Sequence, residues 1–96
     1  MGTFHHDKGA LHGITVVVDT PGPRLFVGRC DTITPAGVVL LDADVHDAEA
    51  PGPKGAPVSK QDYLARIAAW GFFKRHDRLV VPHDDVVTVT PLGELA

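Results

Sequence analysis

Several features that would narrow the function are scarce in this chain of 96 residues. It has one cysteine, Cys30, so an intrachain disulfide is impossible and nothing points to an oxidising compartment. No apolar run approaches the ~18 residues that a membrane-spanning helix needs, and the first residues lack the basic and apolar stretches of a secretory leader. We therefore expect a soluble, cytoplasmic protein with no membrane partner.

The chain also lacks an excess of positive charge. It has 9 Lys and Arg against 12 Asp and Glu, which gives a formal net charge of −3, and the basic residues look scattered. Proteins that bind phosphate backbones usually present a basic face. With 44% hydrophobic and 22% charged residues, the composition is that of a folded protein, and the length predicts one domain over 1–96.

What the chain does have is five short segments rich in β-branched residues, at 14–19, 24–33, 38–45, 79–81 and 86–90. Such side chains are stiff and favour pleated strands. A tight turn over 34–37 separates the second and third strands. Gly28 in mid-strand predicts a bend or bulge, and Asp42 with Asp44 would put one face of the third strand in water. We predict a mainly β fold, a five-stranded, strongly bent barrel of the SH3-like or Sm-like type.

One helix is expected between the third and fourth strands. Ser59 is a candidate N-cap with Asp62 three residues later, and the apolar residues that follow fall at helical spacing. The helix and its aromatic end form an insertion over 59–73, preceded by a mobile loop over 47–58 that is rich in Ala, Pro and Gly. The polar segment 1–13 is expected to be an arm or a short helix.

The helix ends in an aromatic cluster, Trp70-Gly71-Phe72-Phe73, which holds half of all the aromatic residues. We expect these rings to seal the helix onto the barrel or against a neighbouring subunit, and the alternative is that they stack on a ligand. The stretch Lys74-Arg75-His76-Asp77-Arg78 is expected to be an exposed basic turn before the last two strands.

Two stretches give the chain a resemblance to a known family. The first has the strand glycine Gly28 and continues to Val38-Val39-Leu40-Leu41, and the second is Val81-Pro82-His83-Asp84-Asp85-Val86-Val87-Thr88-Val89. In this order they resemble the two motifs of the Sm-like proteins, which include Sm, Lsm and bacterial Hfq proteins. The high Ala, Gly, Val, Asp and Pro content suggests a divergent bacterial member, with the helix inserted in the variable region between the motifs.

The resemblance implies a ring whose pore binds a uracil-like base of RNA. In the family, a loop Asn of the first motif and an Arg-Gly pair of the second line that pore. Here Thr34 replaces the Asp of the first motif, Gly37 comes nearest to the Asn position, and Pro82-His83 replaces Arg-Gly. The candidate RNA-binding residues are Thr34, Gly37, His83 and Asp84. Both side chains that usually give specificity are missing, and the acidic residues would concentrate negative potential near the pore.

The resemblance also implies a cyclic homo-oligomer, because in this family the fourth strand of one subunit pairs with the fifth strand of the next. The corresponding segments keep a β-branched character, and an uncovered edge of this kind is an aggregation hazard. The candidate interface residues are Leu79, Val80, Val81, Val86, Val87, Thr88 and Val89.

Metal and catalytic chemistry are not expected. Four of the six histidines are followed directly by aspartate, and His83, Asp84 and Asp85 are the strongest candidate ligands, but no short metal-binding spacing occurs. We predict no metal and no cofactor. No nucleophile has an evident base beside it, since Ser59 is expected to cap a helix and Cys30 to lie in the core, so an enzyme is not predicted.

Two functions of different class remain open. The first is a ring that binds RNA without the usual uridine-pocket residues, and it predicts RNA binding that weakens steeply as salt rises. The second is an oligomeric scaffold or protein-interaction module with no nucleic-acid binding, whose working surface is the inserted helix and its aromatic cluster.

Overall fold

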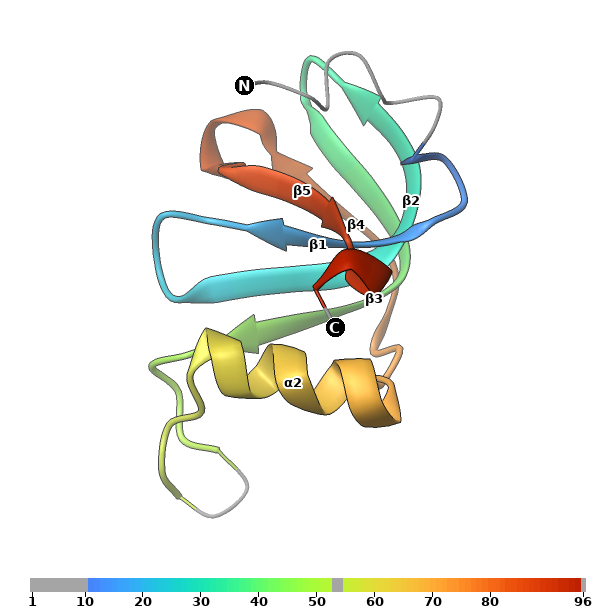
Figure 1. Cartoon of the computed structure of the whole chain (residues 1–96). Coiled ribbons are helices and arrows are strands. Elements are labelled where there is room, and N and C mark those ends of the chain that lie inside the picture. Colours follow the sequence, from blue (N-terminus) through green and yellow to red (C-terminus); the bar gives the residue numbers. More distant parts are fainter. Residues whose placement is uncertain (1–10, 53–54, 96) are drawn as a thin grey trace.

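One strongly bent antiparallel sheet dominates the computed structural model, which describes residues 11–52 and 55–95 (Figure 1). The strand order is β4-β3-β2-β1-β5, so β4 and β5 lie at opposite edges and the sheet is not closed. The elements in chain order are β1 (Thr15–Asp19), β2 (Arg24–Thr34), β3 (Gly37–Asp47), α2 (Lys60–Trp70), β4 (His76–Pro82), a 3₁₀ turn (His83–Asp85), β5 (Thr88–Pro91) and a final 3₁₀ turn (Leu92–Glu94). The predicted mainly β, five-stranded fold with a helix between the third and fourth strands is confirmed.

The boundaries of β4 differ from the expectation. The predicted basic turn over 74–78 is wrong in its second half, because β4 already begins at His76. Backbone pairing explains the early start: β3 has 11 residues, and its Leu41 and Ala43 pair with Arg78 and His76. A long β3 therefore provides partners for two residues, His76 and Arg78, whose side chains alone do not favour a strand.

Gly28 of β2 passes close over β3 at one of two irregularities in their pairing. The register between these strands shifts between Val27 and Arg29, which confirms the irregularity predicted at this glycine. A Cβ at Gly28 would lie 2.8 Å from the Cβ of Ala43, closer than such atoms normally approach. Beside it, Asp42 has a φ of 49°, a left-handed conformation that aspartate tolerates better than most residues. Together these two positions let two long strands curl around a small core.

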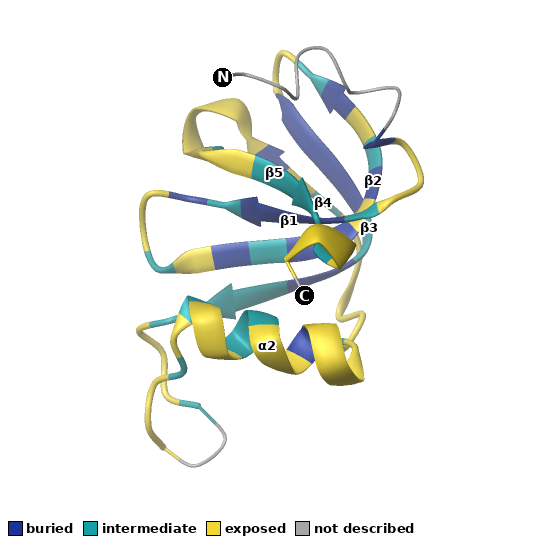
Figure 2. Cartoon of the chain, in the orientation of Figure 1, coloured by how far each residue is buried: buried dark blue, intermediate teal, exposed yellow. Residues whose placement is uncertain are grey.

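Alternation along the strands divides the apolar residues between two cores. On β1 and β2, Val16, Val18 and Phe26 pack inside the bend, whereas Val17 and Leu25 pack on the opposite face, beneath α2. The buried strands and the exposed outer side of α2 are visible in Figure 2. The inner core is made of Leu11, Val16, Val18, Cys30, Ile33, Val38, Leu40, Ala43 and Val81. The outer core is made of Val17, Leu25, Val27 and Ile67, with Tyr63, Leu64, Phe72 and Leu92 packed against them.

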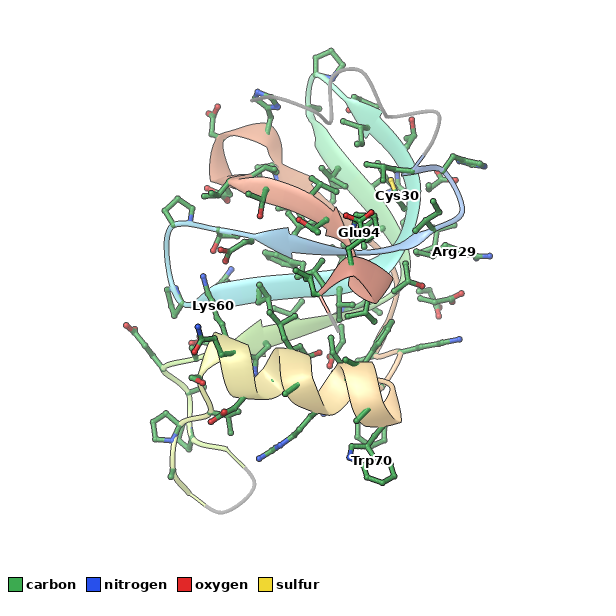
Figure 3. The ribbon with its side chains drawn as sticks, in the orientation of Figure 1. Arg29, Cys30, Lys60, Trp70 and Glu94 are labelled. Carbon is green, nitrogen blue, oxygen red and sulfur yellow. The ribbon has the colours of Figure 1, made fainter. Side chains whose placement is uncertain are left out.

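Short polar contacts fix both ends of α2. The Ser59 hydroxyl accepts a hydrogen bond from the Asp62 N–H at 3.1 Å, which confirms the predicted N-cap. Gly71, with a φ of 81°, ends the helix by donating its N–H to the Ile67 carbonyl at 2.9 Å. The Lys60 ammonium binds the Asp19 carboxylate at 2.6 Å and so ties the first turn of α2 to the end of β1 (Figure 3).

No helix among the described residues has the length and apolar character needed to span a membrane.

Two predicted segments lie partly outside the described residues. For the expected arm 1–13, only the last three residues are described: Leu11 is buried in the inner core, and the Gly13 N–H donates to the Cys30 carbonyl at 2.7 Å. For the expected loop 47–58, residues 53–54 are not described, and Pro51 and Pro57 form an isolated antiparallel bridge across the gap. The mobility of this loop stays a prediction.

The close approach at Gly28 is testable by adding one methyl group. We expect Gly28→Ala to lower the free energy of unfolding by about 1–3 kcal/mol, because the new Cβ must push β2 away from Ala43. Gly22→Ala is the matched control, since a Cβ there meets nothing within 4 Å. Urea unfolding of both variants measures the difference. Equal midpoints for the two variants would show that β2 and β3 do not approach this closely.

Candidate functional site

The two turns that carry the predicted RNA-binding residues lie side by side. Gly37 at the start of β3 pairs with Pro82 at the end of β4, and the His83 N–H donates to the Ala36 carbonyl at 3.0 Å. The folded chain therefore brings the 34–37 turn and the 83–85 turn to one corner of the sheet, although 45 residues of sequence separate Pro82 from Gly37. The sequence motifs alone did not show that the two turns lie side by side.

At this corner, Thr34 and Gly37 have structural roles in the turn. The Thr34 hydroxyl accepts hydrogen bonds from the N–H groups of Ala36 and Gly37 at 3.2 and 3.3 Å. A Cβ at Gly37 would lie 2.1 Å from the Val81 carbonyl oxygen, so only glycine fits there. Neither residue offers a side chain placed to recognise a base.

The second turn contributes exposed acidic groups. Asp84 and Asp85 both lie in the 3₁₀ turn, and neither is buried. Their negative charge opposes phosphate binding at this corner. Within 11–52 and 55–95, no three His, Cys, Asp or Glu side chains converge to hold a metal ion, so His83, Asp84 and Asp85 do not form such a group.

The predicted interface residues divide into two sets. Leu79, Val81, Val86 and Val89 pack against the inner core of their own chain. By contrast, Val80 is 42% exposed, Val87 is 52% exposed, and Thr88 is also exposed. In the described sheet, β4 pairs only with β3 and β5 only with β1, which leaves one backbone edge of each strand without a strand partner.

A groove of about 390 Å³ lies between α2, the end of β3 and the loop that joins them. Sequence reasoning did not identify it. Its floor includes Asp44, and its walls include the aromatic rings of Tyr63 and Phe73 and the cationic side chains of Arg66 and Arg75. The volume is within the ~300–1,000 Å³ range of small-molecule pockets.

Asp44 is buried, with 3% of its surface exposed, so the prediction that Asp42 and Asp44 share a solvated face is wrong for Asp44. The left-handed backbone at Asp42 breaks the two-residue repeat of β3, so Ala43 and Asp44 are both buried. Asp42 stays partly exposed and pairs with Arg29 at 3.3 Å.

The buried Asp44 carboxylate connects three elements. Its Oδ2 accepts a hydrogen bond from the Tyr63 hydroxyl of α2 at 2.9 Å. Its Oδ1 has no hydrogen-bond partner, and the nearest cation is the Arg75 Nε at 3.7 Å. Since a buried charge needs compensation, Tyr63 and Arg75 hold this carboxylate in place and fasten the helix and the segment after it to β3.

Burial raises the pKa of Tyr63 above its ordinary value of 10.0, and the hydrogen bond to Asp44 raises it further. Burial likewise raises the pKa of Cys30, with a smaller contribution from Asp31. A buried thiol with a raised pKa is a poor nucleophile, so Cys30 acts as a core residue, as the sequence predicted.

The ring of His46 stacks on Tyr63 with centroids 4.3 Å apart and an interplanar angle of 3°. The Nε2 of His46 also forms a hydrogen bond of 2.7 Å with the Val58 carbonyl. This histidine therefore joins β3, the end of the loop and α2, and has a structural role at the edge of the groove.

The aromatic cluster 70–73 does not seal the helix onto its own sheet. Phe72 packs against the outer core, but Trp70 is 88% exposed and Phe73 is 72% exposed. Trp70 extends from the end of α2 away from the sheet (Figure 3). The prediction is therefore wrong for Trp70 and Phe73 within one chain, and their packing against a neighbouring subunit stays a prediction.

Comparison with known proteins places the fold. No protein-family model matches the chain, and no curated protein sequence matches it. Among solved structures, it is similar to the Sm protein of Pyrococcus abyssii in complex with a uridine heptamer, with a TM-score of 0.58, 19% identity, and coverage of 91% of this chain and 94% of that one. It is also similar to a chain of the NatC complex bound to CoA, with a TM-score of 0.52, 16% identity, and 92% of both chains covered. The chain therefore has an Sm-like fold.

The contact between Tyr63 and Asp44 can be tested in two ways with the chain's single tyrosine. Tyr63→Phe leaves a buried carboxylate without its hydrogen-bond donor, and we expect it to lower the free energy of unfolding by about 1–3 kcal/mol.

In the unmodified protein, the folded state binds the phenol proton of Tyr63 more tightly than the unfolded state does. The free energy of unfolding should therefore not depend on the ionisation of Tyr63 at neutral pH, and it should fall as the pH rises above 10.

Absorbance at 295 nm against pH measures the second effect, because phenolate absorbs there. We expect the phenolate signal to appear above pH 10 and together with the loss of near-UV dichroism. A phenolate that forms near pH 10 in the folded protein would contradict the buried contact with Asp44.

Proposed function

We propose that this Sm-like domain forms a cyclic homo-oligomer that serves as a binding module, with β4 of one copy paired to β5 of the next. The observation that carries the proposal is the open sheet, which ends in two antiparallel edge strands with no strand partner among the described residues. Exposed Val80 and Val87 lie on or beside these edges and would be covered by a neighbour.

The geometry of the edges favours a ring. Pairing β4 with β5 uses two different surfaces of the same chain, and such head-to-tail contacts either close into a ring or continue into a filament. The sheet is strongly bent rather than flat, so each added copy turns the assembly, which favours closure. Covering both edges also removes the aggregation hazard that exposed valines would create.

Binding rather than catalysis fits the side chains. Cys30 is buried with a raised thiol pKa, and the Ser59 hydroxyl caps α2, so both potential nucleophiles have structural roles. We propose RNA as the ligand of the module, with an oligomeric protein scaffold as the alternative. The corner formed by Thr34, Gly37 and Asp84 does not support the family's uridine pocket, because it offers no base-recognising side chain and is acidic.

One proline substitution tests the ring. The His83 N–H donates to the Ala36 carbonyl at 3.0 Å in the same register as the β3–β4 pairs, so by strand alternation the Val80 N–H points to the open side of β4. Val80→Pro removes that outward donor without removing a bond to β3. Gel filtration with light scattering should give a multiple of the chain mass for the unmodified protein and the monomer mass for Val80→Pro.

Val80→Ile is the matched control, because it keeps both the N–H and a β-branched side chain, and it should stay oligomeric. Circular dichroism should be the same for all three proteins. A monomeric mass of the unmodified protein at micromolar concentration would overturn the ring proposal.

A further inference from the structure

Positive charge is concentrated in one segment of this acidic chain. Residues 66–78 carry Arg66, Lys74, Arg75 and Arg78 against a single acid, Asp77, so their formal charge is +3 while the whole chain is −3. All four basic residues are exposed. The sequence predicts a basic stretch at 74–78, but the basic residues of the whole chain were treated as scattered, so their concentration over 66–78 was missed. A count in a sliding window would have revealed it.

The two most exposed aromatic rings of the described chain lie in the same segment. Trp70 ends α2 and extends into solvent (Figure 3), and Phe73 follows three residues after the helix end. The Arg75 guanidinium sits 5.4 Å from the centroid of the Phe73 ring. Large apolar rings at a protein surface indicate an interaction site when they are grouped.

We propose that the end of α2 and the segment after it, residues 66–78, form a platform for single-stranded RNA on the outside of the molecule, away from the 34–37 and 83–85 turns. This proposal rests on the proposed function, in which the module binds RNA, and it places the RNA at a different site from the one that the family resemblance implies. Exposed aromatic rings stack on unpaired bases of any sequence, and flanking Arg and Lys side chains bind the phosphates.

The groove beside the platform has room for an unstacked nucleotide. Phe73, Arg66 and Arg75 belong both to the basic segment and to the walls of the 390 Å³ groove. The contacts of Asp44 with Tyr63 and Arg75 keep the platform in a fixed position on β3.

Charge and ring chemistry together favour RNA over a protein partner. An acidic protein surface would match the basic residues but usually exposes few flat aromatic groups, whereas successive bases of a single strand can stack on both Trp70 and Phe73. In a ring, each copy would present one platform, so a strand that touches several copies would bind more tightly than a single platform allows.

The test uses the full chain and a fluorescein-labelled single-stranded RNA of 12 mixed-sequence nucleotides, with fluorescence anisotropy as the readout. Trp70→Ala should weaken binding by about tenfold or more, since one stacked base is lost. Arg66→Gln should weaken it and reduce the slope of log K against log salt by about 0.7, the value for one phosphate contact on a single strand.

Two control variants define the site. Arg29→Gln removes an equally charged, exposed side chain outside the platform and should leave both affinity and salt slope unchanged. His83→Ala changes the turn where the family resemblance placed RNA and should also have no effect on affinity. A single-stranded DNA of the same sequence shows whether the platform requires RNA, and DNA that binds more tightly than the RNA would overturn the RNA assignment.

The outcomes separate this proposal from the ring. Binding that His83→Ala abolishes and Trp70→Ala leaves intact would overturn the platform. The platform would also be overturned if the unmodified protein is oligomeric but binds no RNA, or if it binds polyglutamate more tightly than RNA. In both cases the ring proposal would stand. Trp70-dependent binding by a monomeric protein would support the platform and overturn the ring.

Discussion

The close passage of β2 over β3 at Gly28 is the constraint on which the rest of the structure depends. Because no side chain separates Gly28 from Ala43, and because Asp42 adopts a left-handed backbone, two 11-residue strands can curl tightly within one short chain. The curl encloses the inner core on one face and leaves the other face for α2. It also brings β4 and β5 to the two open edges of the sheet, where another copy can pair.

The same irregularity decides where charges lie. By breaking the alternation of β3, Asp42 allows Asp44 to turn under α2, where Tyr63 and Arg75 compensate it. That contact fixes the helix and the basic segment 66–78 against the sheet. The acidic 83–85 turn is part of the β4–β5 connection, a different element. An overall negative protein thus presents a locally positive, aromatic surface, which a net charge for the whole chain cannot reveal.

The sequence was informative where local rules decide the structure. Apolar alternation located the five strands, Gly28 marked the bend, and Ser59 marked the start of α2. It failed where tertiary contacts decide. The burial of Asp44 depends on a backbone irregularity two residues earlier, and the strand character of 76–78 depends on partners in β3. The exposure of Trp70 was missed because an aromatic residue at a helix end normally predicts burial.

The central claim, that the open strand edges pair with another copy, is tested most directly by hydrogen exchange of single amides in β5. Val87 donates to Asp19 within the chain and serves as an internal reference for a protected amide. The account predicts that the Val89 amide, which strand alternation directs to the open side of β5, is also protected at high protein concentration and loses protection on dilution, while Val87 stays protected. Rapid exchange at Val89 at every concentration, beside a protected Val87, would contradict it.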